Sequence, residues 1–167
     1  MIFLEEHSRL LLVLHTICGG ALVASSTHLV VWARGYWRGN FARERGVKRF
    51  AWIVACLFVA QVLLGLVIYP IYKVRVRTEY FDDPTASMQL YQTTQKISRW
   101  FDVKEHAVGI GLAVAIALVW ILSAYKPKQH GDSIAPVIAG MALFVAATTW
   151  LAAIVGIVTV SFRSIGT

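Results

Sequence analysis

Apolar residues in this chain form long, nearly unbroken blocks separated by polar segments. The blocks run over residues 10–33, 50–72, 103–125 and 134–162, and none carries Lys, Arg, Asp or Glu in its central stretch. Crossing ~30 Å of hydrocarbon takes about 20 apolar residues in a helix, which pairs every backbone amide within the segment. The pattern therefore predicts an all-α fold, a single domain of residues 1–167 that forms an integral membrane four-helix bundle with up-down-up-down topology.

The composition agrees with a lipid environment. Of the 167 residues 57% are hydrophobic, and the mean hydropathy is +0.63. The formal net charge of +7 comes from basic residues beside the apolar blocks. Membrane topology explains such residues without nucleic acid as a partner. Glu5 and Glu6 precede a first block that is too long for a signal peptide, so we expect a retained helix.

The distribution of basic residues predicts an orientation in the membrane. The short segment 34–49 carries a single acid, Glu44, among the basic residues Arg34, Arg38, Arg43, Arg45, Lys48 and Arg49. Short segments rich in Lys and Arg favour the cytoplasmic side. We therefore expect a multi-pass protein of the cytoplasmic (inner) membrane, with both termini and the loop 73–102 outside the cytoplasm.

The connection 73–102 is the longest segment outside the apolar blocks. Basic and apolar residues alternate over 73–77, which predicts a short strand. Later in the loop, large apolar residues share one helical face: Met88, Tyr91, Ile97 and Trp100. They predict a surface helix lying against the membrane or a partner, and a solvated loop is the alternative.

Two histidines lie at matching depths in different predicted helices. His15 is a few residues inside the first span and His106 a few residues inside the third. If both termini and the 73–102 loop share one side, both histidines belong to the same leaflet. Haem iron is commonly held by histidine, and bundle cofactors are bound by side chains of facing helices. His15 and His106 are therefore the predicted axial ligands of one b-type haem.

Residues near both histidines suit a macrocycle. Gly19 follows His15 by one turn and Gly109 follows His106, which leaves flat space beside each ligand. Arg99 and Lys104, or alternatively Arg75 and Arg77, lie at the level of the haem propionates. Gly19, Gly109, Arg99 and Lys104 complete the predicted cofactor site.

Other interpretations of these residues remain open. Small residues allow two membrane helices to pack closely, and a histidine can hydrogen-bond across a bundle. Another metal or a quinone also suits an intramembrane histidine. Gln61, near the middle of the second span, can donate to a quinone or to a neighbouring helix, and the neighbouring helix is the preferred reading.

A second haem is a weaker hypothesis, with His28 and His130 as its ligands. Thirteen residues separate His15 from His28. At ~100° per residue they lie about 140° apart around the helix, so they do not share a face. A polar cluster with the neighbouring hydroxyl residues 25–27 is the preferred role for His28.

The arrangement resembles the b-type cytochrome subunits of respiratory oxidoreductases, such as succinate dehydrogenase membrane anchors and cytochrome b561-like proteins. The resemblance covers the four spans and rests on His15 and His106. It departs from the b561 pattern in that the second and fourth spans contain no histidine. It implies one haem b, passing electrons between an extracytoplasmic partner and a quinone or another membrane subunit.

The sequence contains no phosphate-binding loop, no HExxH, no GxSxG and no CxxCH motif, and no catalytic residue is predicted. We therefore expect an electron-transfer subunit of a larger respiratory or photosynthetic oxidoreductase complex, in contact with other membrane or extracytoplasmic subunits. A cofactor-free membrane scaffold or assembly subunit of such a complex is the alternative.

Overall fold

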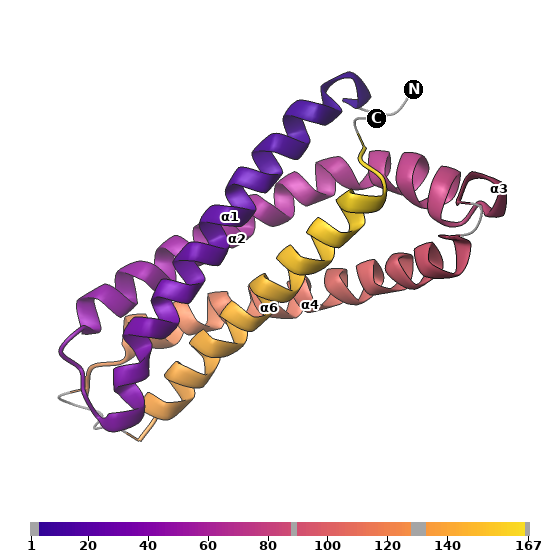
Figure 1. Cartoon of the computed structure of the whole chain (residues 1–167). Helices are drawn as coiled ribbons and strands as arrows, with labels where there is room; N and C mark the ends of the chain where they lie inside the picture. The colour runs from indigo at the N-terminus through magenta and orange to yellow at the C-terminus, as the bar shows by residue number, and fades with distance from the viewer. Residues whose placement is uncertain (1–3, 88–89, 128–132, 166–167) are drawn as a thin grey trace.

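Four long helices pack antiparallel, as Figure 1 shows. The computed structural model describes residues 4–87, 90–127 and 133–165. The helices are α1 (Ser8–Ala33), α2 (Glu44–Ile71), α4 (Tyr91–Ala124) and α6 (Ala135–Phe162). All four are long and apolar enough to cross a membrane. The predicted all-α bundle is confirmed, and the chain is a multi-pass membrane protein.

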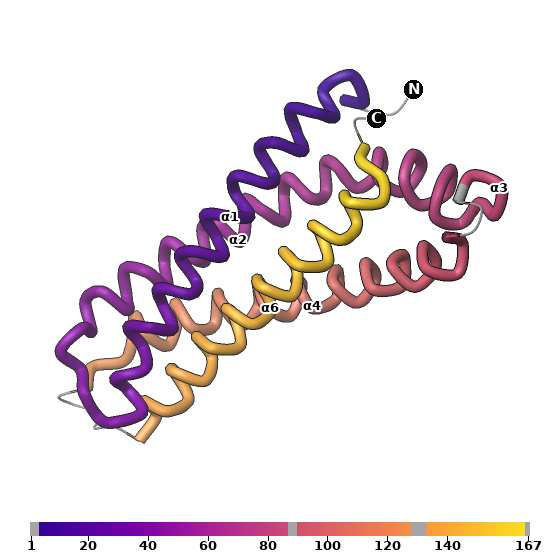
Figure 2. Tube along the Cα trace, in the orientation of Figure 1, coloured from indigo at the N-terminus to yellow at the C-terminus, as the bar shows by residue number. Residues whose placement is uncertain are grey.

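The bundle has two different ends. We call the end that carries the segment 34–49 the basic end, and the end at which α1 begins and α6 ends the terminal end. α1 packs against α2 and α6, and α4 packs against the same two helices, so α1 and α4 lie across the bundle from each other. The helices run close together at the basic end and spread apart toward the termini (Figure 2).

The basic end holds most of the hydrophobic core. Leu29, Val47, Phe58, Leu118 and Ile138 are almost completely buried there, so each long helix contributes at least one side chain. A short 3-10 helix, η2 (Arg34–Arg38), turns the chain between α1 and α2 and ends at Gly39, whose φ of 64° is easily adopted only by glycine. This half of the bundle is closed by apolar packing.

The predicted strand at 73–77 is wrong, because this segment is helical. It belongs to a π-helix, η3 (Tyr72–Phe81), which continues α2 beyond the apolar block. Val76 is buried against α4 while Val74 is partly exposed, so the alternation reflects two sides of a helix. Ion pairs stabilise η3 from two directions, with Arg75 bonded to Glu5 and Glu79, and Arg77 bonded to both carboxylate oxygens of Asp102.

The rest of the predicted loop is also mostly helical. A short helix, α3 (Pro84–Ser87), begins after Asp83, whose carboxylate accepts hydrogen bonds from the Thr85 amide and hydroxyl. These bonds lower the pKa of Asp83. The predicted separate surface helix is wrong, because Tyr91 begins α4 itself, and within α4 Ile97 is buried while Trp100 is exposed. Met88 lies outside the described residues.

A buried pair of hydroxyls joins α1 to α6 in the middle of the bundle. Ser26 Oγ and Thr149 Oγ1 lie 2.8 Å apart. Interhelical hydrogen bonds in membrane proteins average about 0.6 kcal/mol in double-mutant cycles. We therefore expect a coupling energy of about 0.6 kcal/mol between Ser26→Ala and Thr149→Ala. The double-mutant cycle is measured as free energies of unfolding in mixed micelles. Thr16→Ala is the control, because the Thr16 hydroxyl bonds only Leu12 of its own helix and should show no coupling to Thr149→Ala.

Candidate functional site

The hydrophobic core is interrupted in the half of the bundle nearer the termini. Among fully buried residues, α1 has none between positions 8 and 22, α2 none between 58 and 68, and α4 none between 98 and 111. We call this stretch of the three helices the core gap. Beyond it a second, smaller cluster forms around Tyr72 and Phe81. Three polar side chains from different helices lie within the core gap, namely His15, Gln61 and Lys104.

His15 and Gln61 form the centre of this polar group. The amide nitrogen of Gln61 donates to Nε2 of His15 across a distance of 2.9 Å, which ties α1 to α2. Two glycines make room for the pair. A Cβ at Gly65 would lie 3.6 Å from His15 Cε1, and one at Gly19 would lie 3.1 Å from Gln61 Nε2. Gly19 therefore lies at the site, and Gln61 takes the neighbouring-helix role that the sequence favoured.

Lys104 brings a positive charge to the same place from α4. It lies close enough to His15 for its charge to act on the imidazole. Its Nζ is 4.0 Å from the centre of the Phe101 ring, and Phe101 in turn stacks on Tyr72 at 3.9 Å. Within the described part of the chain no carboxylate forms an ion pair with Lys104. The site thus has a cation beside an aromatic ring; the charge of Glu105 acts on Lys104, but the two form no ion pair in the described structure.

Several buried polar atoms around the core gap have unused hydrogen-bonding capacity. Nδ1 of His15, Oε1 of Gln61 and the hydroxyl of Tyr72 are all buried, and none has a hydrogen-bond partner among the described residues. Buried polar groups are normally paired, because an unpaired one costs about 1–3 kcal/mol. Three such atoms and the Lys104 ammonium leave hydrogen-bonding and charge-pairing capacity for a polar or anionic group.

His106 does not lie at this site. It is exposed, and its Nδ1 donates to the backbone carbonyl of Asp102 at 2.8 Å. Positions two apart on a helix differ by ~200°, so His106 and Lys104 lie on nearly opposite faces of α4. Gly109 shares the exposed face, since a Cβ there would meet nothing within 4 Å. The structure therefore does not bring His106 and His15 together, although their depths match.

The basic residues considered for propionate binding divide into two groups. Lys104 lies near enough to His15 for its charge to act on the imidazole, as described. Arg99 is exposed on another face of α4, and Arg75 and Arg77 are engaged by carboxylates outside the core gap. Of these residues, only Lys104 is placed to meet a negatively charged group next to His15.

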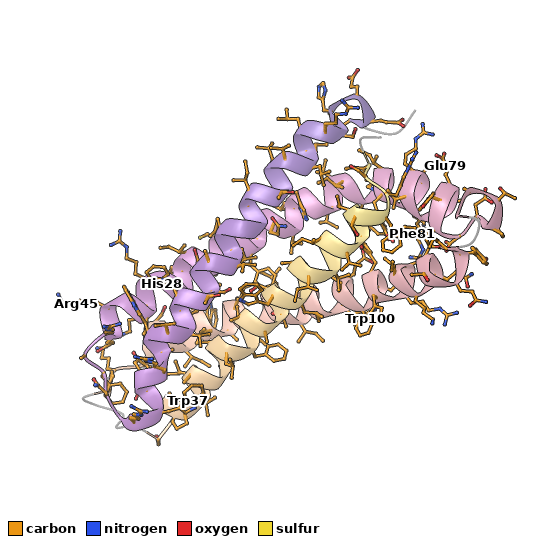
Figure 3. The ribbon with its side chains drawn as sticks, viewed as in Figure 1. His28, Trp37, Arg45, Glu79, Phe81 and Trp100 are labelled. Carbon is orange, nitrogen blue, oxygen red and sulfur yellow. The ribbon has the colours of Figure 1, made fainter. Side chains whose placement is uncertain are left out.

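Of the second predicted pair, the structure describes His28 alone. His28 is exposed and stacks on Phe50 at a ring-centre distance of 5.2 Å, as part of an aromatic group with Trp32 at the basic end (Figure 3). The predicted polar cluster around His28 is wrong, because Ser26 bonds Thr149 and Thr27 accepts a bond from the Trp150 indole. His130 lies outside the described residues.

Sequence reasoning missed Gly65, Phe101 and Tyr72 as parts of the site. Gly65 lies one helical turn after Gln61, and Phe101 lies one turn before Lys104, so both share a helix face with a polar residue of the core gap. That spacing was the available signal.

Comparison with known proteins identified no relative, since no protein-family model, curated protein or solved structure matches the chain.

Proposed function

We propose that this protein is a membrane-embedded electron-transfer subunit that binds one b-type haem in the core gap, with His15 as an axial ligand. The observation that carries the proposal is the core gap itself, where three helices have no fully buried residue, His15 bonds Gln61 and the charge of Lys104 acts on His15. A bound b-type haem supplies a reversible one-electron couple at this position.

The donor set fits such a group. Imidazole is a common haem ligand, and ligation through Nε2 of His15 would replace the hydrogen bond that this nitrogen accepts from Gln61. Lys104 offers a positive charge to a propionate, and Phe101 holds that ammonium in place. The Tyr72 hydroxyl is a further donor for a carboxylate oxygen.

The second axial position has a defined candidate in His106. A carbonyl oxygen only accepts hydrogen bonds, so the bond to Asp102 puts the proton of a neutral His106 ring on Nδ1 and leaves the lone pair on Nε2. That nitrogen is therefore ready to bind iron. Because His106 and Lys104 are on opposite faces of α4, ligation by His106 would require the terminal half of α4 to turn and would carry Lys104 away from the site, so these two roles belong to alternative arrangements of α4.

The location of the site suits exchange of electrons with a partner at the terminal end. The core gap lies between the closed core of the basic end and the helical extension formed by η3, α3 and the start of α4. In the proposed orientation this extension is extracytoplasmic. Electrons pass between a subunit docked there and the quinone pool or another membrane subunit, which makes the chain one part of an oxidoreductase complex.

A visible spectrum tests the proposal directly. We expect protein purified in detergent from haem-replete cells to contain about one haem b per chain and to show sharp bands on reduction, as a low-spin centre does. A colourless preparation with full helical content contradicts the proposal. It supports the second candidate, a cofactor-free scaffold in which the bond between His15 and Gln61 only joins two helices.

Lys104→Met provides a quantitative prediction at the same site. The substitution keeps the length and much of the volume of the side chain but removes the only inward-facing cation of the described core gap. Loss of one charge-assisted contact costs about 1.5 kcal/mol, so haem should dissociate about tenfold more readily, as measured by transfer to apomyoglobin. Lys96→Met, on an exposed position of α4, is the matched control and should retain haem as the wild type does.

A further inference from the structure

Most of the acidic side chains of the terminal end are already engaged by basic residues. Glu5 and Glu79 bond Arg75, while Asp82 and Asp102 lie within ion-pair distance of Arg77. Lys96 and Arg99 are exposed on α4, and neither has an acidic partner among the described residues. The terminal end thus presents two neighbouring cations whose charge the chain itself does not compensate.

These two cations border an apolar groove on the outside of the bundle. Lys96, Arg99, Trp100 and Val103 line a shallow cavity of about 170 Å³. Their spacing of three, four and seven residues places them on one face of α4. Trp100 is 56% exposed and Val103 50% exposed, and Figure 3 shows Trp100 on the side of α4 that faces away from the other helices. The groove is therefore open to whatever surrounds the bundle at this level.

The level of the groove identifies its surroundings. Val103 marks the start of the apolar block of α4, and Ile110, two turns further along the same side, is also largely exposed. The side of α4 that carries Val103 and Ile110 also exposes His106 but is otherwise apolar, so it faces hydrocarbon. Lys96 and Arg99, two turns and one turn before Val103, lie at the level of the headgroups. Tryptophan is enriched at this boundary because its ring is amphipathic.

We propose that this groove binds an anionic phospholipid of the leaflet at the terminal end. The phosphate group lies between Lys96 and Arg99, the glycerol region contacts the Trp100 indole, and an acyl chain follows Val103 toward Ile110. Two uncompensated cations next to an apolar groove complement a molecule that joins a negative headgroup to a hydrocarbon chain. Neither free phosphate nor a zwitterionic lipid satisfies both halves of the groove equally well.

Quenching of Trp100 by brominated lipids tests this site locally. The full chain is placed in nanodiscs of phosphatidylcholine that contain a small fraction of either brominated phosphatidylglycerol or brominated phosphatidylcholine. The difference in fluorescence between the wild type and Trp100→Phe isolates the signal of Trp100. We expect the anionic brominated lipid to quench that signal with about tenfold higher apparent affinity than the zwitterionic one.

Charge variants decide whether the preference comes from the groove. The double variant Lys96→Gln with Arg99→Gln should lose the preference for the anionic lipid. The control double variant, Arg38→Gln with Arg45→Gln, removes two exposed cations at the basic end and should keep the preference for the anionic lipid. Equal quenching by the two lipids in the wild type overturns the proposal, as does a preference that survives in the Lys96 and Arg99 variant.

Two further results would assign the groove to another ligand. Loss of the preference on addition of millimolar inorganic phosphate at constant ionic strength would show a phosphate-ion site. A Trp100 signal that neither brominated lipid quenches would show that a protein surface or another part of the assembly covers the groove. Either result overturns lipid binding at this position, and neither depends on haem in the core gap.

Discussion

Gly111→Ala is expected to destabilise the bundle by about 2 kcal/mol, because overpacking a close helix contact typically costs 1–3 kcal/mol. A Cβ at position 111 would lie 2.5 Å from Oγ1 of Thr148 and 3.0 Å from Cζ of Phe58. Both neighbours are buried, and they belong to α6 and α2, so α4 would have to move away from two helices at once. The measurement is the free energy of unfolding in mixed micelles.

The matched control for this prediction is on the same helix. A Cβ at Gly109 would meet no atom within 4 Å, so Gly109→Ala adds a methyl group to the exposed side of α4 without a clash. We expect its stability to equal or slightly exceed that of the wild type, because alanine is the better helix former. Similar losses for both variants would mean that packing against Thr148 and Phe58 does not set the cost.

A second-site substitution tests the cause. Thr148→Ala removes the hydroxyl that lies nearest to the added methyl group, so it should recover part of the stability lost in Gly111→Ala. The hydroxyl bonds the carbonyl of Val145 within its own helix, so Thr148→Ala alone should be a mild change. No recovery in the double variant would point to Phe58 as the contact that limits packing.

The four spans were predictable because burial in lipid demands long apolar helices whatever the sequence detail. The depths of His15 and His106 were predictable for the same reason, since depth follows from position along a span. Rotation about the helix axis was not predictable in this way. Whether His106 or Lys104 faces the bundle depends on how α4 packs against α2 and α6, and both faces of α4 are largely apolar.

The segment 73–77 was misjudged for a related reason. A two-residue alternation predicts a strand in a soluble protein, but here the segment follows directly on a transmembrane helix that continues past the membrane. Continuing the helix keeps its backbone amides paired and brings Arg77 to Asp102 and Arg75 to Glu5. The ion-pair partners are distant in sequence, so no local pattern indicated them.

The roles of Gly65 and Phe101 could not be predicted from the sequence either, because they depend on contacts with other side chains. Gly65 leaves room for His15 of a different helix, and the Phe101 ring contacts Lys104 one turn further along α4. Gln61 was noticed because an amide within an apolar span stands out, and a membrane helix rarely buries one without a partner. Polar residues in the spans were therefore found from sequence, whereas the small and aromatic residues that support them were not.

His15→Ala is expected to remove most of the haem, lowering the haem content per chain at least about tenfold, because an axial bond to iron has no replacement among nearby side chains. The bond between Gln61 and His15 is also lost, which should cost only about 0.6 kcal/mol of stability. Helical content measured by circular dichroism should therefore remain that of the wild type. A His15→Ala protein with its reduced bands intact would contradict the assignment.

Two other histidine variants give this experiment its controls. His28→Ala should retain the bands, because His28 packs against Phe50 and Trp32 at the far end of the bundle. His106→Ala separates two geometries of the holoprotein. If the terminal half of α4 turns to bring Nε2 of His106 to the iron, the sharp low-spin bands give way to a high-spin spectrum. Unchanged bands would show that His106 is not a ligand of the haem.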